Sequence, residues 1–311
     1  MSFLNKKTKT VTEKKVIDGY SDSDNRLSKE DAHRDVQYNI PSTAKQLWIT
    51  YMIQMKLYMK GKIPWLFLMF ALLIPIIIYS GIFNSLIDSL LNRLYPSSGN
   101  YIRMLLTALV PMMVLTSAIA LSKNIPSEFK DRTAYLNLAL PQSRFTFYLG
   151  KFLAGLTIIF VLFFLVIGLC IFIANGKYET AISGLLSAMA LIFGGLFAFC
   201  GTIYGLSVFF KKGSAILPLI VLFVALPLIF GYAAWKYSSI ADLIGYLPVF
   251  AGDYAQTLLG ADLGITVSVA YVFGVINDST MPNIALALIS YIIWGIAFLS
   301  LGYYFFKRRE M

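Results

Sequence analysis

The sequence contains little of the chemistry on which most enzymes depend. Of its 311 residues one is histidine and two are cysteine, and only 14% are charged, compared with roughly 25% in soluble domains. His33 lies in the polar N-terminal stretch, and Cys170 and Cys200 lie inside apolar runs without the spacing of metal ligands. Catalytic and metal centres need clusters of histidine, cysteine or acidic side chains. The composition therefore disfavours a membrane enzyme and predicts no metal site.

Two further absences argue that the chain neither binds a nucleotide in the usual way nor couples transport to an ion gradient. No phosphate loop of the form G-x-x-x-x-G-K-[ST] occurs, so the chain lacks the usual cradle for a nucleotide. The interiors of its long apolar runs hold no ionised residue, whereas carriers driven by ion gradients place such residues in the membrane. An apolar secretion signal does not follow the basic start, so we expect no signal peptide. If the protein moves a solute, a partner must supply the energy.

Apolar residues are abundant, at 58% of the chain, and a helix needs about 20 of them to cross a bilayer. We predict an all-α integral membrane protein with six transmembrane helices, at about 63–83, 103–122, 147–174, 181–210, 214–235 and 283–306. The apolar segment 265–276 is too short for a seventh, so 236–282 is predicted to form short extracellular helices. A small-residue face suited to close helix contact lies in the fourth span, at Gly194, Gly195, Gly201 and Gly205.

The distribution of charge predicts the orientation. The chain has 26 Lys and Arg residues and 16 acidic residues, a net charge of +10. All but four of the basic residues fall on one side of the predicted spans, the exceptions being Arg93, Arg103, Lys177 and Lys236. Because basic residues are enriched in cytoplasmic loops, we predict a cell-membrane protein with both termini in the cytoplasm. Membrane orientation thus explains the positive charge, and no nucleic-acid partner is expected.

Two segments precede the first span. Residues 1–40 carry a basic cluster and then an acidic run with few apolar residues, which predicts a mobile cytoplasmic tail, either solvated or in contact with a partner or lipid. Residues 41–62 place Trp48, Met52 and Met59 along one helical stripe, with Met55 between them and lysines elsewhere. This pattern is typical of an amphipathic helix at the membrane interface. The transmembrane domain then occupies 63–311.

A charged loop, Ser122–Lys151, separates the second and third predicted spans and has a helical pattern of its own. Pro126 suits a first helical turn, with Asn124 or Ser127 available as the cap. Phe129, Thr133, Leu136 and Leu140 then recur on one face of a short helix. Pro141 ends that helix, and Ser143 can cap the next one.

The loop also carries a family resemblance. Its pattern Glu128-x-x-Asp131-x-Thr133, Pro141-x-Ser143-Arg144 and Gly150-Lys151 resembles the first cytoplasmic loop of ABC-2 type transporter permeases, with Arg132 where that family often has Gly. The resemblance implies a coupling helix that docks on a separate ATPase, and the helix at 41–62 is similar to the family's elbow helix. The implied coupling residues are Glu128, Phe129, Asp131, Arg132, Thr133, Leu136, Pro141 and Arg144. Glu128 and Asp131 are three apart, so we expect them to share one outward face. A lone interfacial helix without a partner remains the alternative.

The resemblance further implies the permease subunit of an ABC exporter that works by alternating access as a homodimer, or paired with a similar permease. ATP and Mg would be bound by the ATPase, and this chain would hold no cofactor. Spans two and five would flank the dimer interface, which places Met104, Met112, Met113, Val221 and Phe223 on the translocation path. Because that path is apolar, an amphipathic or lipophilic cargo is expected. The alternative is a structural or regulatory membrane protein with the same fold that moves nothing.

Overall fold

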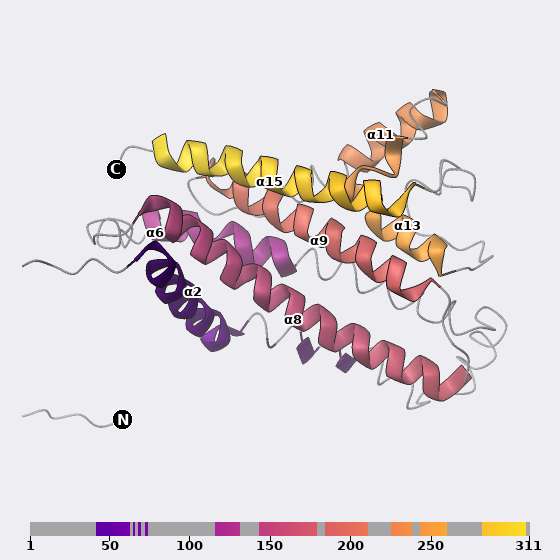
Figure 1. Ribbon diagram of the computed structural model, residues 1–311, viewed down its shortest axis with the longest axis horizontal. Coiled ribbons are helices and arrows are strands. Elements are labelled where there is room, and N and C mark those ends of the chain that lie inside the picture. The colour runs from indigo at the N-terminus through magenta and orange to yellow at the C-terminus, as the bar shows by residue number, and fades with distance from the viewer. Residues whose placement is uncertain are drawn as a thin grey trace, which may run out of the picture. The chain divides into compact units, whose positions relative to one another are not determined.

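The computed structural model describes residues 42–62, 65, 68–69, 72–73, 116–130, 143–178, 184–210, 225–237, 243–259 and 282–308. All of them belong to one unit of the chain, Pro41–Met311, and these parts are helical without a strand. The helices are α2 (Thr43–Lys60), α6 (Asn124–Lys130), α8 (Arg144–Tyr178), α9 (Leu185–Ser207), α11 (Leu226–Lys236), the 3-10 helix η2 (Pro248–Phe250), α13 (Ala251–Leu258) and α15 (Ile284–Arg308), as labelled in Figure 1.

Three of these helices are long and apolar enough to cross a membrane. They are Arg144–Gly176 within α8, Leu185–Ser207 (α9) and Ile284–Arg308 (α15). They coincide with the third, fourth and sixth predicted spans. Of the fifth span, α11 covers the C-terminal part, and residues 116–122 of the second span are helical. Of the first span, residues 65, 68–69 and 72–73 are described and helical, and the rest of these three spans lies outside the described residues.

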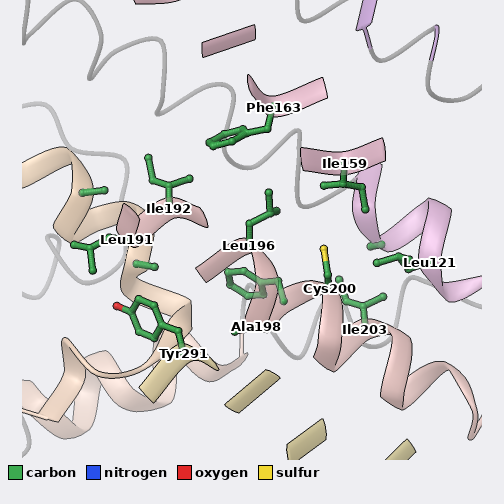
Figure 2. Close-up of a cluster of buried hydrophobic side chains, with 14 of the residues drawn as sticks. Leu121, Ile159, Phe163, Leu191, Ile192, Leu196, Ala198, Cys200, Ile203 and Tyr291 are labelled. Atoms are coloured by element: carbon green, nitrogen blue, oxygen red, sulfur yellow. The ribbon is translucent and has the colours of Figure 1, made fainter. Parts of the chain in front are cut away.

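α9 is the interior helix of the described part. Within its most apolar stretch 61% is buried, against 17% for α15, and α9 packs against α15, α13, α8 and α6. Its side chains join a core that also draws on α8 and α15. Figure 2 shows this cluster, with Ile159 and Phe163 from α8, Leu196 from α9 and Tyr291 from α15. Burial of apolar side chains on three sides thus fixes α9 at the centre.

Glycines set the close approach of α9 and α15. A Cβ atom at Gly201 would lie 2.7 Å from the carbonyl oxygen of Gly295, and one at Gly205 would overlap the carbonyl of Phe298. From the other helix, a Cβ at Gly302 would lie 2.5 Å from the Cα of Gly205. Any larger residue at these positions forces the backbones apart. The predicted close helix contact of the fourth span is therefore confirmed, with α15 as the partner of Gly194, Gly201 and Gly205.

The segment 243–259 contains short helices, as predicted for the loop between the fifth and sixth spans, but it is packed tightly onto α9. A Cβ at Gly195 would lie 2.5 Å from the Cβ of Ala251. Gly195 is ten residues into α9, about 15 Å along the helix axis from the first residue of α9. Two side-chain hydroxyls of α15 bind backbone carbonyls of the turn before η2. Tyr291 donates to the carbonyl of Gly245 and Ser290 to the carbonyl of Tyr246, both at 2.8 Å. Polar backbone groups that are buried need such partners.

Candidate functional site

A buried polar cluster lies where α2, α6 and the first turns of α8 meet. Its centre is Lys151 of α8, whose side chain is 5% exposed and whose Nζ forms an ion pair with the Glu128 carboxylate of α6. The same nitrogen donates to the main-chain carbonyl of Asn124, 3.5 Å away. Asn124 and Glu128 are four residues apart, so both lie on one side of a single helical turn. One lysine therefore holds that turn against α8.

The surroundings of Lys151 are low in polarity, which makes its partner necessary. Its Nζ lies 4.7 Å from the centroid of the Phe147 ring, and the Glu128 side chain is itself only 17% exposed. Removing one member of a buried ion pair leaves an uncompensated charge and costs about 3–5 kcal/mol. The pair is thus a strong constraint on the position of α6.

α2 joins the cluster through its polar face. The side-chain amide of Asn124 donates to the Tyr58 hydroxyl, and Tyr58 also hydrogen-bonds the side chain of Gln54. Burial raises the pKa of Tyr58 well above its ordinary value, so the phenol stays neutral over the physiological range. Asn124 therefore contacts both neighbouring helices: its side chain donates to Tyr58 of α2, and its carbonyl accepts from Lys151 of α8. The bond to Tyr58 uses the amide nitrogen of Asn124, and the capping role that the sequence suggested for its oxygen stays a prediction.

Two glycines of α8 make room for α2. A Cβ at Gly150 would lie 3.0 Å from the Cβ and Cγ2 atoms of Thr50. A Cβ at Gly155 would lie 3.0 Å from the Tyr58 hydroxyl and would overlap the Leu121 side chain. Each residue of the Gly150-Lys151 pair therefore has a structural role: the glycine leaves room for α2, and the lysine binds α6.

The face of α2 that packs against α8 differs from its apolar stripe. Thr50 and Gln54 are buried, and Met55 is half-buried. The other residues of the predicted stripe are about half exposed, as are the isoleucines and leucine beside them: Trp48, Ile49, Met52, Ile53, Leu57 and Met59. An apolar face left open on such a helix suits the membrane interface.

The start of α8 is tied to α2 and α15. The Ser143 hydroxyl accepts a hydrogen bond from the main-chain nitrogen of Thr146 at 3.1 Å, which confirms the predicted cap. The Ser143 nitrogen donates to the Gln46 side chain of α2 at 3.3 Å. Arg144 Nη1 donates to the carbonyl of Lys307 at the end of α15, 2.8 Å away. Arg144 thus satisfies a carbonyl at a helix end of its own chain, and its role in coupling to a partner stays a prediction.

The structure describes three of the predicted site residues, Glu128, Phe129 and Arg144. Glu128 was expected to face outward with Asp131; its carboxylate instead turns inward, because Lys151 is buried and needs a counter-ion. The helix containing Phe129 forms with Pro126 in its first turn, as predicted. The other predicted coupling residues lie outside the described residues, namely Asp131, Arg132, Thr133, Leu136 and Pro141. So do all five predicted path residues, Met104, Met112, Met113, Val221 and Phe223.

Lys151 is the residue that sequence reasoning missed as part of the site. It was part of the pattern Gly150-Lys151 but not one of the implied coupling residues, although a lysine at the start of a long apolar run is itself a signal, because burying it requires an acid nearby. In the described parts of the chain no three His, Cys, Asp or Glu side chains gather as metal ligands would. The contacts of the site join α2, α6 and α8.

Comparison with protein families gives a match over residues 5–311, nearly the whole chain, to the family described as ABC-2 family transporter protein. No curated protein matches the chain. The match includes the loop with α6, the three long apolar helices and the α2 segment.

Proposed function

Because this chain belongs to the ABC-2 family of transporter proteins, we propose that it is the permease subunit of an ATP-driven exporter and works by alternating access with a separate ATPase. The ATPase would bind ATP and Mg and carry out the hydrolysis, and this chain would be non-catalytic. The family match and the three membrane-length helices support a membrane subunit. The missing phosphate loop supports an external source of energy.

The observation that carries the coupling role is the ion pair between Lys151 and Glu128. It connects the loop helix α6 directly to α8, a helix long enough to span the membrane. A force applied to the loop would thus reach a spanning helix through a bond within the chain. In this proposal Glu128 and Arg144 anchor the loop. The residues that would contact the ATPase are Phe129, Asp131, Arg132, Thr133, Leu136 and Pro141.

The proposed arrangement in the membrane has six spans and both termini in the cytoplasm. Residues 1–40 form the tail, 41–62 the elbow helix at the lipid interface, and 63–311 the transmembrane domain. Six spans are half of what the family needs, so two permeases pair, as a homodimer or with a similar chain. The path between them, lined by Met104, Met112, Met113, Val221 and Phe223, would suit an amphipathic or lipophilic cargo.

Purification of the full-length tagged chain from its host in mild detergent tests this function. We expect a phosphate-loop ATPase to accompany it and the preparation to hydrolyse ATP, whereas the chain freed of that subunit should be inert. A preparation without an ATPase would favour a structural or regulatory membrane protein of the same fold. Nucleotide turnover by the chain alone would contradict the proposal outright.

A further inference from the structure

Three helices that are distant in sequence meet at one set of polar contacts. Asn124 of α6 binds Tyr58 of α2 through its side chain and Lys151 of α8 through its carbonyl, and Glu128 adds the ion pair to Lys151. Figure 1 shows α2, α6 and the first turns of α8 close to one another, in agreement with the contacts between α2 and α8. We call this set, Tyr58, Asn124, Glu128 and Lys151, the junction.

We propose that Lys151 is the positioning residue that makes α2, α6 and the base of α8 move as one unit. Its role in transport rests on the proposed function, because an ATPase would be what moves α6. The linkage between the three helices does not depend on that partner and can be tested without it.

The described part of α6 comprises Asn124–Lys130. In proteins most of the stability of a helix comes from tertiary packing. α6 packs against α9 and its Ile125 is buried in the apolar core, but apolar contacts are non-directional and do not fix rotation. Hydrogen bonds and an ion pair require defined distances and angles. The junction is therefore what fixes how α6 is turned relative to α2 and α8.

The shape of α8 shows that this contact with α2 is close. Gly155 stands one turn beyond Lys151, and its missing side chain is what lets the Tyr58 hydroxyl and Leu121 lie against the helix. Gly150 does the same for Thr50. With both glycines, α2 approaches α8 closely enough for Tyr58 to reach Asn124. Moving α6 alone would break this bond and the ion pair together.

Hydrogen exchange of the full chain in lipid nanodiscs tests the proposal. The variants are Lys151→Met, Glu128→Gln and the double variant Glu128→Gln/Lys151→Met, with Lys123→Met as control because Lys123 is exposed and adjacent to α6. In both single variants we expect amide exchange to rise at least about tenfold in α6 and in residues 54–60 of α2, since losing one member of a buried pair is costly. Exchange in α9 and α15 should stay at wild-type rates.

The double variant distinguishes a positioning role of Lys151 from a contribution to stability alone. It removes both charges, so neither is left buried and alone, and the protein should recover most of the loss in thermal midpoint. If Lys151 positions the helices, α6 and α2 still exchange faster in the double variant. If wild-type exchange returns there, or if α9 and α15 accelerate as much as α6 in the single variants, Lys151 serves stability alone and the proposal fails. ATPase co-purification is a separate readout, so either result can fail while the other holds.

Discussion

Arg144 at the first residue of α8 donates to the carbonyl oxygen of Lys307 near the last residue of α15, 2.8 Å away. Tyr204 near the end of α9 likewise donates to the carbonyl of Tyr148 at 2.7 Å. The start of α8 and the ends of α9 and α15 therefore lie on the same side of the helices. This relationship supports an odd number of crossings between α9 and α15, as the proposed fifth span provides. It also agrees with the basic residues at these ends being cytoplasmic.

Cysteine labelling in intact cells checks this topology. In a background lacking Cys170 and Cys200, both of which are buried, single cysteines would replace Lys177 and Lys212. An impermeant thiol reagent should label position 177 from outside and position 212 only after permeabilisation. Labelling of position 212 in intact cells would contradict the six-span arrangement.

The ion pair predicts an asymmetry between single and double substitutions. Lys151→Met or Glu128→Gln alone should lower the free energy of unfolding by about 3–5 kcal/mol, because each leaves one buried charge unpaired. The double variant should recover most of that loss. Thermal unfolding followed by fluorescence-detected gel filtration measures it, with Lys123→Met expected to change stability by less than about 0.5 kcal/mol. Two equal, additive losses would show that the pair is not coupled.

Two glycines on α8 offer a matched test of close packing. Gly155→Ala would push a methyl group into Leu121 and Tyr58, whereas at Gly168 no atom of another described element lies within 4 Å of the added carbon. We expect Gly155→Ala to destabilise the protein by about 1–3 kcal/mol through overpacking. Gly168→Ala should be neutral or stabilise by up to about 1 kcal/mol through helix propensity. Equal effects in thermal unfolding would mean that α2 does not pack on α8 in this way.

The raised pKa of Tyr58 predicts that the stability of the protein depends on pH. Because burial raises its pKa in the folded protein, the unfolded chain releases this proton first, at about pH 10. Its contribution to stability is therefore complete below that pH and is lost as the pH rises. Tyr58→Phe should cost about 1–3 kcal/mol at neutral pH by leaving the Asn124 amide unsatisfied. The difference from wild type should shrink above about pH 10; a constant difference would argue against a buried phenol.

The sequence predicts those features that depend on local composition. Length and apolarity identified the three long helices, the glycine spacing identified the close face of α9, and Ser143 follows a known capping pattern. Lys151 and Glu128 are 23 residues apart and form a pair only because α6 folds back on α8. The face of α2 that is buried could not be predicted from the sequence either. Gly150 and Gly155 on α8 make room for α2, and Thr50 and Gln54 are buried there in place of the more apolar stripe.

The central claim is that the loop containing α6 couples this chain to an ATPase, and the molar ratio of ATPase to permease after purification tests it most directly. The comparison is between wild type, Asp131→Ala/Leu136→Ala in the loop, and Lys56→Ala on the exposed side of α2 as control. We predict one ATPase per permease in wild type and control, and a fall of at least about tenfold in the loop variant, because contacts broken across an interface cost several kcal/mol. An unchanged ratio and unchanged ATP hydrolysis in the loop variant, at normal permease yield, would contradict the account.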